Sequence, residues 1–192
     1  MLNAVHQLIE KLGLYDEYIP DADISDSKQL RYDLRTYYHR HQLLPATQSN
    51  LALIDRLFGG AKKPIFTSTN ARNHLISFAE IMAMYLLVWS PVCWRLIDKQ
   101  TPLFANSQDS ERYRRELERI DEFVSDLPYA ARAMANIPTY MIFDDHDVTD
   151  DWNLSALWEA TVYEHPFSRR IIGNALIGYL LCQGWGNNPK TF

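Results

Sequence analysis

Apolar side chains recur at helical spacing along most of the chain. Near the N-terminus, Val5, Leu8, Ile9 and Leu12 follow this spacing, and Gly13 comes directly after them. The period predicts a helix, and glycine commonly ends a helix in the left-handed conformation. The same reasoning predicts further helices over residues 26–38, 51–58, 70–87 and 107–126, a helix starting near residue 154, and a last helix that begins at Pro166 and stops near Gly184.

One stretch departs from this helical pattern. Residues 138–143 are uncharged and rich in β-branched and aromatic side chains, which favours a short buried strand. It is the one strand that the pattern predicts clearly, because residues 65–67 fit either a short strand or an extended link. A lone strand cannot satisfy its own backbone groups in a core. We therefore expect it to pair with sequence outside this chain, or weakly with residues 65–67.

A dense group of acidic residues surrounds one histidine directly after this strand. These carboxylates would repel one another at neutral pH unless they are solvated or held by a cation. Carboxylate oxygens with one imidazole suit a hard or borderline metal ion. The other reading is a solvated turn in which the later residues cap the next helix. The residues are Asp144, Asp145, His146, Asp147, Asp150 and Asp151, with Asn153 as a further possible cap.

Three stretches of the chain resemble a known family. They are IFDDHDVTDDWN, the later RRIIGNALIGYLLCQGWGNNP, and the upstream HLISFAEIMAMYLLVWSPVCW. Together they resemble the PhoD-like phosphatases, a branch of the calcineurin-like metallophosphoesterases. The resemblance implies an α/β metallophosphoesterase fragment that is mostly helical as it stands. It implies a single partial domain over residues 1–192, with a helical insertion at about 1–127 and the catalytic strand, loop and following helices at about 137–192.

The resemblance also implies roles for the acidic loop. Asp145 matches a metal-ligand position, and Asp144 would be a further ligand or would orient the loop. His146 matches the histidine that contacts the phosphoryl group, where it would stabilise charge or protonate the leaving oxygen. Asp147, where family members commonly carry glutamate, would hold the His146 ring. The implied reaction is two-metal hydrolysis of phosphate monoesters or diesters, with a metal pair drawn from Fe, Ca, Mn or Zn.

Other motifs of the family are not found in this sequence. Neither the aspartate-and-tyrosine metal motif that normally lies upstream nor the later histidine motifs can be matched. We therefore expect an internal fragment of a phosphohydrolase, inactive by itself, whose partners are the missing parts of the same enzyme and a phosphoester substrate. The alternative is a catalytically inactive remnant or a helical protein-interaction module.

Composition narrows the class of protein further. The chain has 192 residues, of which 47% are hydrophobic, so intrinsic disorder is not expected. A net charge of −5 argues against general nucleic-acid binding. Cys93 and Cys182 form neither a disulfide framework nor a metal motif. We expect a cytoplasmic location without a membrane partner, because no signal peptide is evident and the most apolar window, 81–94, is too short to span a bilayer.

Overall fold

The chain is mainly helical in a computed structural model, which describes residues 1–48, 62–66, 70–98, 100–150, 152–153 and 155–191. The predicted helix over residues 51–58 lies outside the described residues. The α-helices are α1 (Leu2–Leu12), α2 (Ser27–Tyr32), α4 (Phe78–Trp89), α5 (Ser107–Asn136), α6 (Ala156–Glu164), α7 (Pro166–Tyr179) and α8 (Trp185–Asn187). Short 3-10 turns occur at Arg40–Gln42, Ala71–Asn73, Cys93–Leu96 and Asp145–Asp147, and a π-helical turn at Leu180–Gly184. None of the described helices has both the length and the apolar character needed to cross a membrane.

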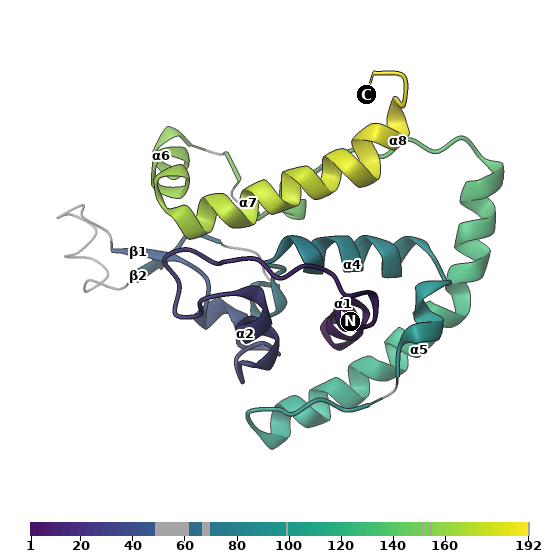
Figure 1. Cartoon of the computed structure of the whole chain (residues 1–192), viewed down its shortest axis with the longest axis horizontal. Coiled ribbons are helices and arrows are strands. Elements are labelled where there is room, and N and C mark those ends of the chain that lie inside the picture. The colour runs from purple at the N-terminus through teal and green to yellow at the C-terminus, as the bar shows by residue number, and fades with distance from the viewer. Residues whose placement is uncertain (49–61, 67–69, 99, 151, 154, 192) are drawn as a thin grey trace.

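Helix α4 lies at the centre of the molecule, between α1 and α7 (Figure 1). On one side, the apolar face of α1 packs against Ala83 and Leu87 of α4. On the other side, α7 approaches closely at Gly178, where an added Cβ would lie 2.5 Å from Ile81 Cγ2. The larger core forms around α7 and includes Phe167 and Ile171, both 1% exposed. Helix α4 therefore joins the two cores.

The prediction for the first helix is confirmed. It ends at Gly13, whose φ of 61° is in the left-handed region that glycine adopts without a steric penalty. Val5, Leu8 and Ile9 are at most 1% exposed, as their spacing predicts. The start of α7 at Pro166 is also confirmed, since proline suits the first turn of a helix.

A buried ion pair connects the N-terminal segments to α4. Arg40 and Glu80 are both fully buried, and Arg40 Nη2 donates to Glu80 Oε1 over 2.6 Å. His6 Nε2 lies 2.8 Å from the same oxygen. Glu80 Oε2 also accepts the backbone N–H groups of Ile76 and Ser77. Glu80 therefore lies in an apolar core but is paired with Arg40, and a buried carboxylate requires such a cation.

Two helices differ from their predicted extents. The second ends at Tyr32, so Leu34 is 61% exposed, and Tyr38 adopts a φ of 69° instead of a helical conformation. Helix α4 begins at Phe78 and not near residue 70. Ser77 forms a capping box with Glu80 there, and this reciprocal pairing fixes the helix start.

Helix α5 is longer than the predicted 107–126. It begins after Asn106, whose side chain accepts from Asp109 N, and it continues through Pro128 to Asn136. Figure 1 shows α5 curving around one side of the molecule. Tyr113, Leu117, Ile120 and Val124, which recur at helical spacing in this helix, are half-buried, and Leu127 is the buried apolar residue of α5.

The predicted buried strand over residues 138–143 is wrong, and so is the α/β fold class. The segment is extended but forms no ladder with any described residue. Tyr140 and Ile142 are 77% and 87% exposed, whereas Met141 and Phe143 turn toward the protein. The side chain of Asn187 takes the place of a neighbouring strand, because Oδ1 accepts from Met141 N and Nδ2 donates to Met141 O. A strand needs a partner backbone, and the described residues provide none here.

The strands that the described residues do contain are β1 (Ala46–Gln48) and β2 (Lys62–Pro64). They form an antiparallel pair with Ala46 opposite Pro64. Ile65 extends the contact through a backbone hydrogen bond to Pro45 O. The expected strand or link at 65–67 therefore falls just after β2, and its last residue, Thr67, lies outside the described residues.

Candidate metal-binding turn

The acidic cluster folds into a single tight turn between the extended segment and α6. Asp144 caps the 3-10 turn Asp145–Asp147, because its Oδ1 accepts from Asp145 N over 3.0 Å. In return, Asp144 N donates to Asp147 Oδ2 over 2.9 Å. Aspartate at such a cap satisfies donors that the turn leaves free. Contacts among Asp144, Asp145 and Asp147 thus fix the start of the turn.

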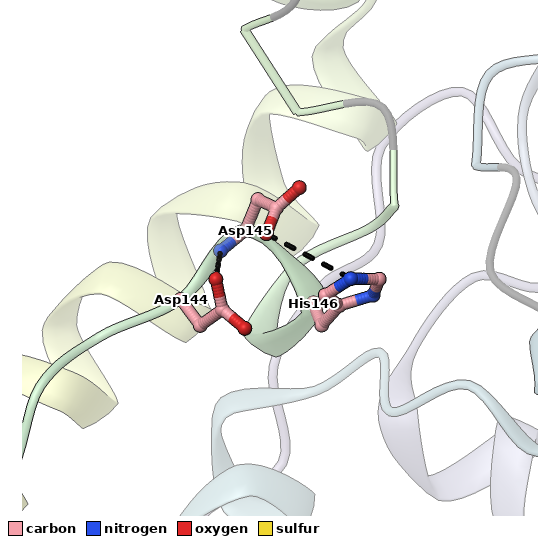
Figure 2. A group of neighbouring side chains, drawn as sticks. All are labelled: Asp144, Asp145 and His146. Carbon is pink, nitrogen blue, oxygen red and sulfur yellow. Dashed lines mark hydrogen bonds and ion pairs between the residues drawn. The ribbon is translucent and has the colours of Figure 1, made fainter.

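Three side chains of this turn bring metal-binding atoms together. One donor atom each from Asp144, Asp145 and His146 lies within 4.8 Å of the others. Figure 2 shows the three side chains leaving the same turn, with Asp145 close to both neighbours. Asp144 and His146 are exposed and Asp145 is half-buried, so a cation could reach them from solvent. Among the described residues, this is the one such group.

Asp150 orients the His146 ring. His146 Nδ1 donates to Asp150 Oδ1 over 2.9 Å, and Nε2 lies 4.0 Å from Asp145 Oδ1. The Asp150 hydrogen bond, followed by the charge of Asp145, raises the pKa of His146 above its usual value. A carboxylate on one ring nitrogen fixes the tautomer and aims the other nitrogen. Nε2 therefore faces the Asp145 side of the turn.

This arrangement differs from the expected role of Asp147. The carboxylate of Asp147 caps the turn, and Asp150 occupies the position beside His146 that the resemblance gave to Asp147. The sequence could have suggested Asp150, because His146 and Asp150 are four residues apart.

Asp150 and Asn153 do not cap the next helix, which was the alternative prediction for them. Ser155 caps α6 by accepting from Trp158 N, and Asp151 lies outside the described residues.

His74 supports the turn from the rest of the protein. Its Nδ1 and Nε2 lie 2.6 Å and 2.8 Å from the carbonyl oxygens of Leu75 and Val148, and its ring meets the edge of Phe66. Val148 and Thr149, which follow the cluster, are buried. The cluster is thus anchored at its C-terminal side. No local signal in the sequence indicated this long-range contact.

A cavity opens beside the turn. Its volume is about 410 Å³, and it is lined by His146 and Asp147 together with side chains from α4, α7 and the π-helical turn. Pockets for small molecules commonly have volumes from about 300 Å³ upward. The candidate metal ligands therefore lie next to a space that can admit an organic group.

Comparisons of this chain with protein-family models, with curated proteins and with solved structures gave no match.

Proposed function

We propose that the acidic turn binds a divalent cation and, through it, the phosphoryl group of a phosphoester, as part of a metal-dependent phosphohydrolase. The observation that carries the proposal is the clustering of Asp144, Asp145 and His146, whose donor atoms fall within 4.8 Å of one another. The resemblance of this loop to the PhoD-like phosphatases supports the same function.

The donor set fits a metal ion by its chemistry. The two carboxylates of Asp144 and Asp145 suit Mn²⁺, Zn²⁺, Ca²⁺ or an iron ion, and the imidazole of His146 lies beside them for the phosphoryl group. When bound, the cation would polarise the phosphoryl oxygens and offset their charge. Asp144 and Asp145 would hold it. A second cation of a metal pair would require ligands beyond this cluster, because the described residues contain no other such group.

His146 would act on the phosphoester. Because Asp150 raises the pKa of His146, the ring keeps its proton to a higher pH than an ordinary histidine. A protonated Nε2 can donate to a phosphoryl oxygen or to the leaving oxygen. Its position 4.0 Å from Asp145 Oδ1 keeps this donor on the side of the turn where the cation would be held.

Binding of inorganic phosphate to the full chain tests the proposal. Calorimetric titrations with and without Mn²⁺ should give phosphate binding that requires the cation. Asp145→Asn should abolish it, and His146→Gln should weaken phosphate binding while leaving Mn²⁺ binding in place. Asp126→Asn, which changes an exposed carboxylate on α5, is the matched control. Cation-independent phosphate binding, or binding unchanged by Asp145→Asn, would refute the proposal.

A second candidate is a protein-interaction module without catalysis. It is favoured by the extended segment that carries Tyr140 and Ile142, whose large apolar side chains are exposed and which forms no strand ladder with the described residues. Such a surface can associate with another polypeptide. If the folded chain binds no cation yet loses its self-association or partner binding in Ile142→Ser, this second function is the correct one.

A further inference from the structure

Apolar side chains from three elements form the walls of the cavity beside the acidic turn. Met84 and Val88 of α4 line one side, Ile171 of α7 lines another, and Phe143 extends from the segment before the turn. Met84, Val88 and Phe143 are only half-buried, so each keeps accessible surface that a bound group could cover. Covering apolar surface stabilises a complex in proportion to the area removed from water.

Aromatic side chains of α4 complete this wall. Tyr85 is half-buried, and Trp89, which is 40% exposed, lies one turn further along the helix. Gln183 Nε2 donates to the Tyr85 hydroxyl over 2.8 Å and so holds this side chain against the π-helical turn. A wall that is held in place before binding takes up a ligand with a smaller loss of entropy.

The charge of the cavity is concentrated at its turn end, where His146 and Asp147 line it. Burial, followed by the charge of Asp147, raises the pKa of the Tyr85 hydroxyl, so this negative charge acts across the cavity. Burial lowers the pKa of His74, which leaves this lining ring neutral at neutral pH. No lysine or arginine is among the described lining residues. A further anionic group on a ligand would therefore lose hydration without gaining a cationic partner.

We infer that the cavity binds the organic group of the phosphoester and selects a group that is apolar and uncharged. The phosphoryl end would lie beside His146 and Asp147, and the organic group would extend between α4 and α7. A cationic group is disfavoured there, because the exposed Asp147 carboxylate already accepts from Asp144 N. The inference rests on the proposed function for its assignment to a phosphoester, whereas the selectivity of the cavity requires no metal.

A series of alcohols tests the cavity without added metal. The dissociation constants of propan-1-ol, butan-1-ol and hexan-1-ol are measured by NMR titration of the full chain. Each added methylene should tighten binding by about three- to fourfold. 6-Hydroxyhexanoate should bind at least about tenfold more weakly than hexan-1-ol, since its carboxylate meets either the apolar wall or the acidic turn.

Variants of the wall locate the binding. Val88→Trp should remove the gain with chain length by filling the cavity, and Met84→Gln should reduce it by placing an amide in the wall. Val92→Trp, at a 62% exposed position outside the cavity lining, is the matched control and should keep the gain. Equal affinities along the series, or a gain that survives both wall variants in folded protein, would overturn the inference.

Alkylphosphonates in the presence of Mn²⁺ test the assignment to a phosphoester. Pentylphosphonate should bind more tightly than methylphosphonate, and more tightly than its analogues with a terminal carboxylate or a terminal amine. Tightest binding of the amine would overturn the selectivity. Mn²⁺-dependent binding of methylphosphonate without any gain with chain length would overturn the inference alone. The alcohol series without phosphonate binding would support the cavity as an apolar site and refute its assignment to a phosphoester.

Discussion

His74 Nε2 lies 2.8 Å from the carbonyl oxygen of Val148, and this contact joins the segment before α4 to the end of the acidic turn. The two residues are 74 positions apart. The cluster itself is exposed, so its shape depends on this anchor and on the cap formed by Asp144 and Asp147.

Removal of this anchor should loosen the turn. His74→Phe keeps an aromatic ring beside Phe66 but removes the contacts of the ring nitrogens with the carbonyl oxygens of Leu75 and Val148. We expect the free energy of unfolding to fall by about 1–3 kcal/mol. Affinity for Mn²⁺ should fall as well, because the donor atoms are less well positioned. Urea unfolding and calorimetric titration measure the two effects. His41→Phe, at an exposed site, should change neither, and an unchanged His74→Phe protein would contradict the anchoring role.

The buried ion pair should dominate the stability of the helical core. Arg40→Met leaves the fully buried Glu80 carboxylate without its main cationic partner. Loss of one member of a buried pair costs about 3–5 kcal/mol, and urea unfolding should detect this. Arg35→Met is the matched control, since Arg35 forms a partly exposed pair with Asp33 that contributes about 1 kcal/mol or less. Similar losses in the two variants would contradict this assignment.

Stability should decrease on mild acidification. Burial lowers the pKa of His6 below its usual value near 6.5, despite the hydrogen bond to Glu80. The unfolded chain therefore binds this proton at a higher pH than the folded chain does, so unfolding takes up a proton. The stability from neutral His6 is fully present above the unfolded pKa and is lost progressively as pH falls below it. The pKa of Glu80 lies well below 4.5, so the stability that the ionised carboxylate contributes is fully present over this pH range and is lost only as pH falls below about 4.5.

The free energy of unfolding, measured between about pH 7.5 and pH 5, checks this expectation. His6→Gln should show a shallower decrease over the same range, since it removes one of the buried histidines. His74, whose pKa is also lowered by burial, accounts for part of the remaining decrease. A slope that is identical with and without His6 would rule out its contribution.

Asp150, and not Asp147, should set the protonation of His146. The hydrogen bond from His146 Nδ1 to Asp150 is the largest cause of the raised pKa of His146. Asp150→Asn should therefore shift the NMR titration midpoint of His146 downward. Asp147→Asn should shift it less, because Asp147 accepts from Asp144 N instead. The opposite order would favour the role that the family resemblance gives to Asp147.

The helices were predictable where burial follows local spacing. Val5, Leu8 and Ile9 show the helical period and are buried, and Pro166 starts α7 as expected. Prediction failed where tertiary partners decide the outcome. Residues 138–143 have the composition of a strand, but the described chain offers them the amide of Asn187 instead of a neighbouring strand.

The candidate site also has some contacts that were predictable from the sequence and others that were not. Asp144, Asp145 and His146 are adjacent in sequence, so their clustering was predictable. The contacts of His74 and Gln183 depend on how distant helices pack. Gln183 Nε2 reaches Tyr85 from 98 positions away, and no sequence period encodes such a contact.

The metal content of the purified, folded chain tests the central claim most directly. After incubation with Mn²⁺ and removal of unbound ions, elemental analysis should find about one equivalent per chain, which Asp145→Asn should lose and Asp126→Asn should keep. A folded chain without bound metal, or one whose metal survives Asp145→Asn, would contradict the assignment of the acidic turn as a metal-binding site.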